Sequence, residues 1–217
     1  MNASEITERV SPTGEARSVS ARKPVLLTWQ DPTAPRLESV RLRTGENGLR
    51  ASGRLVAGTV TEPETKRTEA HSASYELVAG GQGVLTRLLL RTTTADEERQ
   101  VSVSRTEEGI WLIDHGQGVK RSAFSGALDV DVRSCVLFNA LPIRRLRLHR
   151  EAGTHELPVV YIDLPTLQVT EVVQEYSTVE IREDGATIRY TSGEFSADLE
   201  VDSEGLLLTY PGWAQRI

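Results

Sequence analysis

From Pro24 to the C-terminus, short apolar runs of four to ten residues are separated by turn-forming residues such as Asp184-Gly185 and Ser203-Glu204-Gly205. The alternation of apolar and polar residues is clearest just before the second of these turns. Apolar side chains occupy every second position there, in the order Phe195, Ala197, Leu199 and Val201. Because successive side chains of a strand point to opposite faces, the pattern predicts strands with one buried and one wet face.

The same pattern predicts a meander of hairpins along most of the chain. The expected strand pairs are 74–78 with 84–91, 178–182 with 186–190, and 195–201 with 206–210. Segments 161–164 and 169–176 are two further strands, and Pro165 breaks the ladder between them. We expect about 13 to 15 strands. An antiparallel sheet of that size must curl or close on itself, and the lack of a fixed repeat argues against a propeller.

One short helix is expected at 133–140, where Ser134 can cap the first turn and Pro142 stops the helix. The next segment, 141–148, is expected to be extended. Its period of two places Arg144 on the apolar face together with two leucines.

An arginine on an apolar face must be paired or must line a polar cavity, because burying a lone charge is costly. Asp129 or Asp131 is the expected partner of Arg144. Two interpretations therefore stay open. The arginine either forms a buried ion pair that fixes a strand crossing, or holds an anionic or sugar head group in a pocket.

Composition narrows the class of protein. Of 217 residues, 38% are hydrophobic and 26% are charged, as in globular chains rather than disordered or membrane-embedded ones. The formal net charge of −6 argues against a general nucleic-acid-binding protein, although 22 arginines stand against three lysines.

The ends of the chain and its apolar runs suggest a location. No apolar run approaches the ~18 residues of a membrane span, and the N-terminus does not resemble a secretory signal. A cytoplasmic protein is therefore expected. We expect residues 1–23 to be a flexible tail and residues 24–217 to be a single domain.

Residues with obvious chemistry are few. The nucleophile-elbow pattern Gly-x-Ser-x-Gly is absent, and Cys135 has no nearby helper, so we expect a buried structural thiol. Asp129 and Asp131 share one face of a strand and could reach one ion, but no third carboxylate lies nearby in sequence. A polar strand face is the simpler interpretation, and we expect neither a metal nor a cofactor.

Two longer segments carry a family resemblance. Residues 126–131, Gly-Ala-Leu-Asp-Val-Asp, are followed by residues 139–146, Asn-Ala-Leu-Pro-Ile-Arg-Arg-Leu. Together they resemble the signature of the putative glycolipid-binding protein family of bacteria. Other matching positions, in chain order, are Trp29, Glu38, 161–165, Leu167, Tyr176, Tyr190, 195–201, 202–206 and 210–213. The chain departs from the family pattern at four positions near the signature, which are Ala127, Val136, Phe138 and Ala140.

The resemblance implies an all-β fold, a spiral β-roll in which a long antiparallel sheet of about fifteen strands wraps around one helix. It also implies a non-enzymatic protein that binds a lipid, long-chain fatty acid or glycolipid inside the curled sheet. We expect Arg144 to hold an anionic or hydroxyl-rich head group. The other candidate ligand-binding residues are Asp129, Asp131, Asn139, Arg145, Trp29 and Trp213.

Two alternatives stay open at this point. The first is an enzyme of glycolipid metabolism that uses Asp129 and Asp131 as acid and base, since carboxylates at i and i+2 of a strand lie about 6 to 7 Å apart. Ion pairs from these residues to Arg144 or Arg145 would count against that enzyme. The second alternative is a structural module with a solid core and no ligand.

Overall fold

The computed structural model describes residues 23–45, 48–59 and 69–217. The predicted tail, residues 1–23, lies outside the described residues except for Lys23. The described part forms fifteen strands. The first eight are β1 (Val25–Gln30), β2 (Arg36–Gly45), β3 (Gly48–Ala57), β4 (His71–Ala79), β5 (Leu85–Thr93), β6 (Glu98–Arg105), β7 (Trp111–Asp114) and β8 (Val119–Ser122). The other seven are β9 (Asp129–Val132), β10 (Thr154–Ile162), β11 (Val169–Ile181), β12 (Gly185–Ser192), β13 (Phe195–Asp202), β14 (Leu207–Tyr210) and β15 (Ala214–Arg216).

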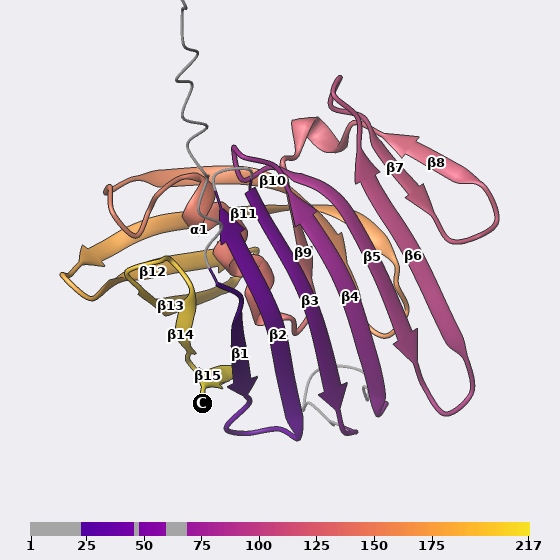
Figure 1. Cartoon of the computed structure of the whole chain (residues 1–217), viewed down its shortest axis with the longest axis horizontal. Coiled ribbons are helices and arrows are strands. Elements are labelled where there is room, and N and C mark those ends of the chain that lie inside the picture. The colour runs from indigo at the N-terminus through magenta and orange to yellow at the C-terminus, as the bar shows by residue number, and fades with distance from the viewer. Residues whose placement is uncertain (1–22, 46–47, 60–68) are drawn as a thin grey trace, which may run out of the picture.

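All fifteen strands belong to one sheet, in the order β8-β7-β6-β5-β4-β3-β2-β1-β15-β14-β13-β12-β11-β10-β9. The first and last strands, β1 and β15, pair with each other and so join the two halves of the meander. The single parallel pair among these strands is β9 with β10. In Figure 1 strands β2–β6 run steeply and β10–β13 run across them, so the sheet is curled around the short helix α1 (Ala140–Arg145). The predicted all-β fold of curled sheet and single helix is confirmed.

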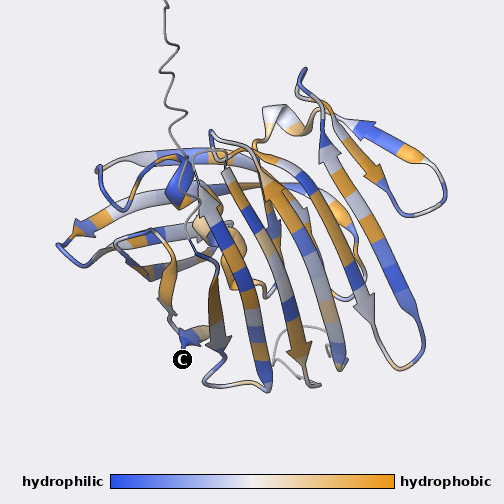
Figure 2. Cartoon of the chain, in the orientation of Figure 1, coloured by the Kyte–Doolittle hydropathy of each residue, from blue (hydrophilic) through white to orange (hydrophobic). Residues whose placement is uncertain are grey.

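The predicted hairpins are also present. Strand β4 pairs with β5, β11 with β12, and β13 with β14, all antiparallel. Figure 2 shows the alternation of apolar and polar residues along β2–β6 that produces the two faces of the sheet. The inward residues include Leu42, Leu55, Leu77 and Leu88, each at most 1% exposed, and their neighbours in sequence face outward.

The interior of the roll is filled by protein side chains. Buried residues from both halves of the sheet and from α1 form one hydrophobic core cluster. Trp29 and Trp111 lie in it, and their indole nitrogens donate to the carbonyl oxygens of Leu207 at 2.9 Å and Ala127 at 3.0 Å. The four departures from the family pattern face this core as well, since Ala127, Val136, Phe138 and Ala140 are all buried.

The helix lies further along the chain than predicted. A 3₁₀ turn covers Val136–Asn139, and α1 follows it directly, so Pro142 is the third residue of the helix rather than its stop. Proline fits there because the first-turn N–H groups of a helix have no intrahelical acceptor. The prediction of a helix at 133–140 was therefore wrong in position.

The predicted extended conformation of 141–148 was wrong too, because residues 140–145 are helical. Burial in α1 follows the helix and not a period of two. Ala140 to Ile143 are buried, whereas Arg144 and Arg145 are half-buried at the C-terminal end. Arg144 therefore does not lie on the apolar face of a strand.

Candidate functional site

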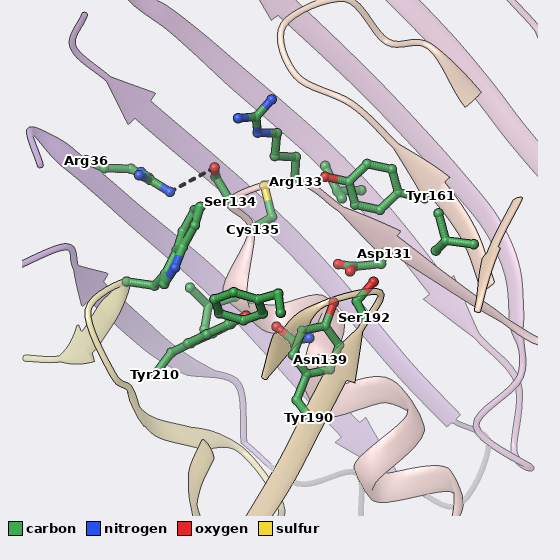
Figure 3. A pocket seen from close by; sticks show the side chains of 15 residues that line it. Arg36, Asp131, Arg133, Ser134, Cys135, Asn139, Tyr161, Tyr190, Ser192 and Tyr210 are labelled. Carbon is green, nitrogen blue, oxygen red and sulfur yellow. Dashed lines mark hydrogen bonds between the residues drawn. The ribbon is translucent and has the colours of Figure 1, made fainter. Parts of the chain in front are cut away.

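A pocket of about 340 Å³ lies where the C-terminal half of the sheet meets the segment after β9. We call it the aromatic pocket, because five aromatic side chains line it: Tyr161, Tyr190, Phe195, Tyr210 and Trp213. Its polar lining includes Arg36, Asp131, Ser134, Asn139 and Ser192. Figure 3 shows Asp131, Ser192 and Tyr190 together on one side of the cavity and the Arg36–Ser134 pair on the other.

Four of the aromatic rings form a continuous wall. The ring centroid of Tyr210 lies 6.2 Å from that of Tyr190, 6.3 Å from that of Phe195 and 6.1 Å from that of Trp213. Tyr190 and Phe195 are also 6.3 Å apart. These separations are within the range in which aromatic rings attract each other. Burial raises the pKa of Tyr190 and Tyr210, so both hydroxyls stay protonated and can donate as well as accept.

Arg36 contacts the last ring of this wall, that of Trp213. Its guanidinium lies 4.7 Å from the ring centroid of Trp213, a cation–π contact. The same group forms an ion pair with Asp31 at 3.0 Å and donates to the Ser134 hydroxyl at 2.8 Å. Arg36 thus fixes the Trp213 ring and the segment after β9 relative to each other.

Asp131 is a buried carboxylate at the polar end of the pocket. It accepts a hydrogen bond from Nε2 of Gln174 at 2.7 Å, and no arginine, lysine or histidine of the described residues forms an ion pair with it. Burial raises the pKa of Asp131 from 3.8 to about 6, although the Gln174 hydrogen bond acts in the opposite direction. Near neutral pH Asp131 is therefore a negative charge with no ion-pair partner among the described residues, since the two arginines that line the pocket, Arg36 and Arg133, pair with Asp31 and Asp163 instead.

A hydrogen-bond network holds the polar end in place. Nε2 of Gln174 also donates to the Tyr190 hydroxyl at 3.0 Å, and the Tyr176 hydroxyl donates to Oε1 of Gln174 at 3.2 Å. Asn139 completes the network by donating from Nδ2 to the Tyr176 hydroxyl at 3.0 Å. Because Tyr176 stands opposite Tyr190 on paired strands, β11 and β12 carry most of this network.

A second buried carboxylate, Glu38, fixes the segment under the pocket. It accepts from the Tyr75 hydroxyl at 2.6 Å and from the backbone N–H of Val136 at 2.5 Å. Burial raises the pKa of Glu38 to about 7. Gly53 makes room for the Tyr75 ring, since a Cβ atom at that position would lie 2.0 Å from Cζ of Tyr75.

Burial also raises the pKa of the Cys135 thiol well above its usual value, so the pocket lining holds a thiol and not a nucleophilic thiolate.

A second pocket, of about 320 Å³, lies at the other end of β2 and β3. Glycines and arginines dominate its lining, and we call it the glycine–arginine pocket; the arginines are Arg144, Arg145 and Arg147. Arg144 donates to the carbonyl oxygen of Glu204. Arg145 donates two hydrogen bonds to the Asp129 carboxylate, from Nε to Oδ1 at 3.2 Å and from Nη2 to Oδ2 at 2.5 Å.

The predicted ligand-binding residues are thus distributed over three places. Asp131, Asn139 and Trp213 line the aromatic pocket, whereas Arg144 and Arg145 line the glycine–arginine pocket. Asp129 pairs with Arg145 rather than with Arg144, so the partner predicted for Arg144 was wrong. Trp29 is 1% exposed and belongs to the core.

Sequence reasoning missed most of the aromatic wall. Tyr161, Tyr190, Phe195 and Tyr210 were not among the candidate residues, and neither was Arg36. The available indication was the position of tyrosines on the apolar faces of neighbouring C-terminal strands. Tyrosine in such a position needs a partner for its hydroxyl, which a pocket supplies.

Groups that could hold a metal are absent from the described residues, since no three His, Cys, Asp or Glu side chains gather suitably. Within the same residues, no helix has the length and apolar character needed to cross a membrane.

Comparisons with known proteins place the chain among similar sequences and folds. The family described as "Putative glycolipid-binding" matches residues 26–216. A crystal structure of a DUF1089 family protein from Pseudomonas aeruginosa is similar at 25% identity and a TM-score of 0.65, covering 87% of this chain and 95% of that one. A β-barrel-like DUF1849 protein from Brucella abortus shares 9% identity at a TM-score of 0.49, over 89% of this chain and 94% of that one. No curated protein matches the chain.

Proposed function

Since the chain belongs to the putative glycolipid-binding family, we propose that it binds a glycolipid through its sugar head group, and that the aromatic pocket is the site. The observation that carries this proposal is the combination of an aromatic wall with a buried, unpaired carboxylate in one cavity. Small-molecule sites commonly combine aromatic walls with a few placed polar groups.

A sugar ring offers C–H groups on its faces and hydroxyls around its rim. The faces match the rings of Tyr210 and Trp213, which expose apolar surface to the cavity. The rim hydroxyls match Asp131, which has free acceptor capacity beyond its bond to Gln174, and Ser192. Because no cation of the described residues forms an ion pair with Asp131, a hydroxyl donor can engage its charge.

The volume of the pocket favours the head group over the acyl chains. A volume of about 340 Å³ lies near the lower limit of small-molecule pockets, which is roughly 300 Å³. That space suits one sugar ring and is too small for two long acyl chains. The interior of the roll, where acyl chains were expected, contains the hydrophobic core cluster. In our proposal the acyl chains therefore stay outside the sheet.

The ion pair of Asp129 counts against the alternative of a two-carboxylate enzyme. Its carboxylate is engaged by Arg145 and lines neither the aromatic nor the glycine–arginine pocket. Asp131 would act alone, whereas hydrolysis of a glycosidic bond ordinarily uses two carboxyl groups. We therefore favour binding over catalysis.

Tryptophan fluorescence tests the proposal, because Trp213 is half-buried in the pocket while Trp29 and Trp111 are fully buried. Octyl β-glucoside below its micellar concentration is the probe, and an octyl oligo(ethylene glycol) ether is the control without a sugar. We expect a saturable change in emission with the glucoside alone. Trp213→Phe should remove the change, and Trp111→Phe should keep it. Equal responses to both probes would contradict sugar recognition.

A further inference from the structure

The outward face of strands β2–β5 concentrates positive charge in an otherwise acidic chain. Six exposed arginines point outward from it, and we call them the arginine face: Arg41, Arg43, Arg50, Arg54, Arg87 and Arg91. Strand register places them in neighbouring rows. Arg43 on β2 stands opposite Arg50 on β3. Arg50 in turn stands opposite Val78 on β4, and Val78 opposite Arg87 on β5, so the three arginines lie in one row across the sheet.

Carboxylates do not balance this charge. The outward positions of these four strands carry a single acidic side chain, Glu76. Six arginines and one glutamate give this face a net charge of +5, whereas the whole chain has a formal net charge of −6. Among the described residues, none of the six arginines forms an ion pair, and Arg91 instead donates to Oε1 of Gln100 at 2.8 Å. Like charges directly opposite each other on a sheet are destabilising.

The other half of the sheet shows the usual arrangement. Arg189 on β12 stands opposite Asp198 on β13 and donates two hydrogen bonds to it, at 2.8 and 3.0 Å. Arg182 likewise contacts two glutamates, one of which is Glu200 on β13. The chain therefore pairs outward arginines with acids in one half and opposes arginine with arginine in the other.

The arrangement of these charges fits a large anionic surface. With strands ~4.8 Å apart and alternate residues ~6.7 Å apart, the six Cα atoms lie within roughly 14 by 14 Å. That is less than two Debye lengths at physiological ionic strength, so the charges act together on a nearby anionic partner.

The side chains around the arginine face favour a lipid surface over a nucleic acid. Outward positions of β2–β5 carry no aromatic residue on which bases could stack, whereas proteins that bind single strands use such residues. Apolar side chains instead lie at its margin, with Leu26 73%, Val56 54% and Leu37 38% exposed. Basic residues beside exposed aliphatic ones are typical of segments that bind at a membrane interface.

We propose that the arginine face docks the protein onto a membrane surface rich in anionic phospholipids. The geometry of this face is separate from the aromatic pocket, so the proposal does not depend on sugar recognition. It complements the proposed function, because a glycolipid whose acyl chains stay outside the sheet is presented by a membrane. Leu37 follows Arg36 of the aromatic pocket directly in β2, so the apolar margin and that pocket residue lie at the same end of the strand, on opposite faces of the sheet.

Co-sedimentation with vesicles tests the docking. One set of vesicles contains phosphatidylcholine alone, and the other contains phosphatidylcholine with phosphatidylglycerol; neither contains a sugar lipid, so sugar binding cannot contribute. We expect the full chain to bind the anionic vesicles and to dissociate as the salt concentration rises. The triple variant R43Q/R50Q/R87Q should bind roughly a hundredfold more weakly, at about fivefold per arginine.

The control is K120Q/R121Q/R150Q, which removes the same formal charge from exposed positions elsewhere. Equal melting temperatures of the two variants establish that both are folded. Three outcomes would overturn the proposal: no preference for anionic vesicles, equal losses in both triple variants, or arginine-dependent binding to single-stranded RNA but not to vesicles. If the protein binds octyl β-glucoside but not the anionic vesicles, the docking is refuted and the proposed function stands. If it binds the vesicles but not the glucoside, the proposed function is refuted and the docking stands.

Discussion

Burial raises the pKa of both aspartates on one face of β9, but Asp129 has the Arg145 guanidinium beside it, which acts in the opposite direction, and Asp131 has no such ion pair among the described residues. Substitution by asparagine is therefore expected to have opposite effects on stability, because at Asp129 it leaves a buried guanidinium without its counter-ion. Asp131 is buried with Gln174 as its hydrogen-bond donor and no cation. Asp129, two residues earlier, is buried against Arg145, whose side chain is 11% exposed. The isosteric changes Asp131→Asn and Asp129→Asn therefore test how each carboxylate is accommodated.

The magnitude for Asp131 follows from its pKa, which burial raises from 3.8 to about 6. At 1.36 kcal/mol per unit, the ionised carboxylate lowers the free energy of unfolding by about 3 kcal/mol. Because the native state binds the proton more tightly, this loss is absent below about pH 4, grows between pH 4 and 6, and is complete above pH 6. Asparagine keeps an acceptor for Gln174 and removes the charge, so D131N should be more stable at pH 8 by up to this amount.

The same change at Asp129 leaves the guanidinium of Arg145 without its counter-ion. Removing one partner of a buried pair is strongly destabilising, so D129N should lose about 3 kcal/mol at pH 8. Guanidinium chloride unfolding followed by tryptophan fluorescence measures both variants at pH 8 and near pH 4, where D131N should match the wild type. If D131N were less stable than the wild type at pH 8, the reasoning about an unpaired buried charge would be refuted.

Three other substitutions test the support of the pocket and the core. Gly53→Ala should lower the free energy of unfolding by about 3 kcal/mol, because its Cβ atom would overlap the Tyr75 ring; a neutral result would contradict that contact. Tyr190→Phe removes an acceptor of Gln174 and should cost about 1 kcal/mol in a denaturation experiment, with weaker octyl β-glucoside binding; unchanged binding would remove Tyr190 from the site. Leu88→Ala in the core should cost 2 to 5 kcal/mol by the same assay and leave glucoside affinity unchanged, and a large loss of affinity would mean that stability and binding are not separable.

Much of the fold could be predicted because strand pairing follows local patterns. The alternation at Phe195–Val201 and the turn at Asp184-Gly185 each define a hairpin without long-range information. The helix was misplaced because Pro142 was interpreted as a stop, although it fits the first turn of α1. Misplacing the helix also misplaced Arg144, since a period of two and a period of 3.6 assign its side chain to different faces.

The candidate site was predicted less completely, because it depends on contacts between distant segments. Arg36 at the start of β2 reaches Trp213 near the C-terminus, and no local pattern indicates that contact. Asp131 and Asn139 could be selected as polar residues in the family signature, yet the network through Gln174 and Tyr176 needs the register of β11 and β12. The pairing of Asp129 with Arg145 likewise depends on where the helix ends.

A crystal structure of the protein with octyl β-glucoside tests the central claim most directly. We predict electron density for the glucose ring in the aromatic pocket, against the rings of Tyr210 and Trp213 and with a hydroxyl donating to Asp131. The octyl chain should leave the cavity. Density for the glucose ring in the glycine–arginine pocket, or for the octyl chain inside the aromatic pocket with its sugar in solvent, would contradict the account.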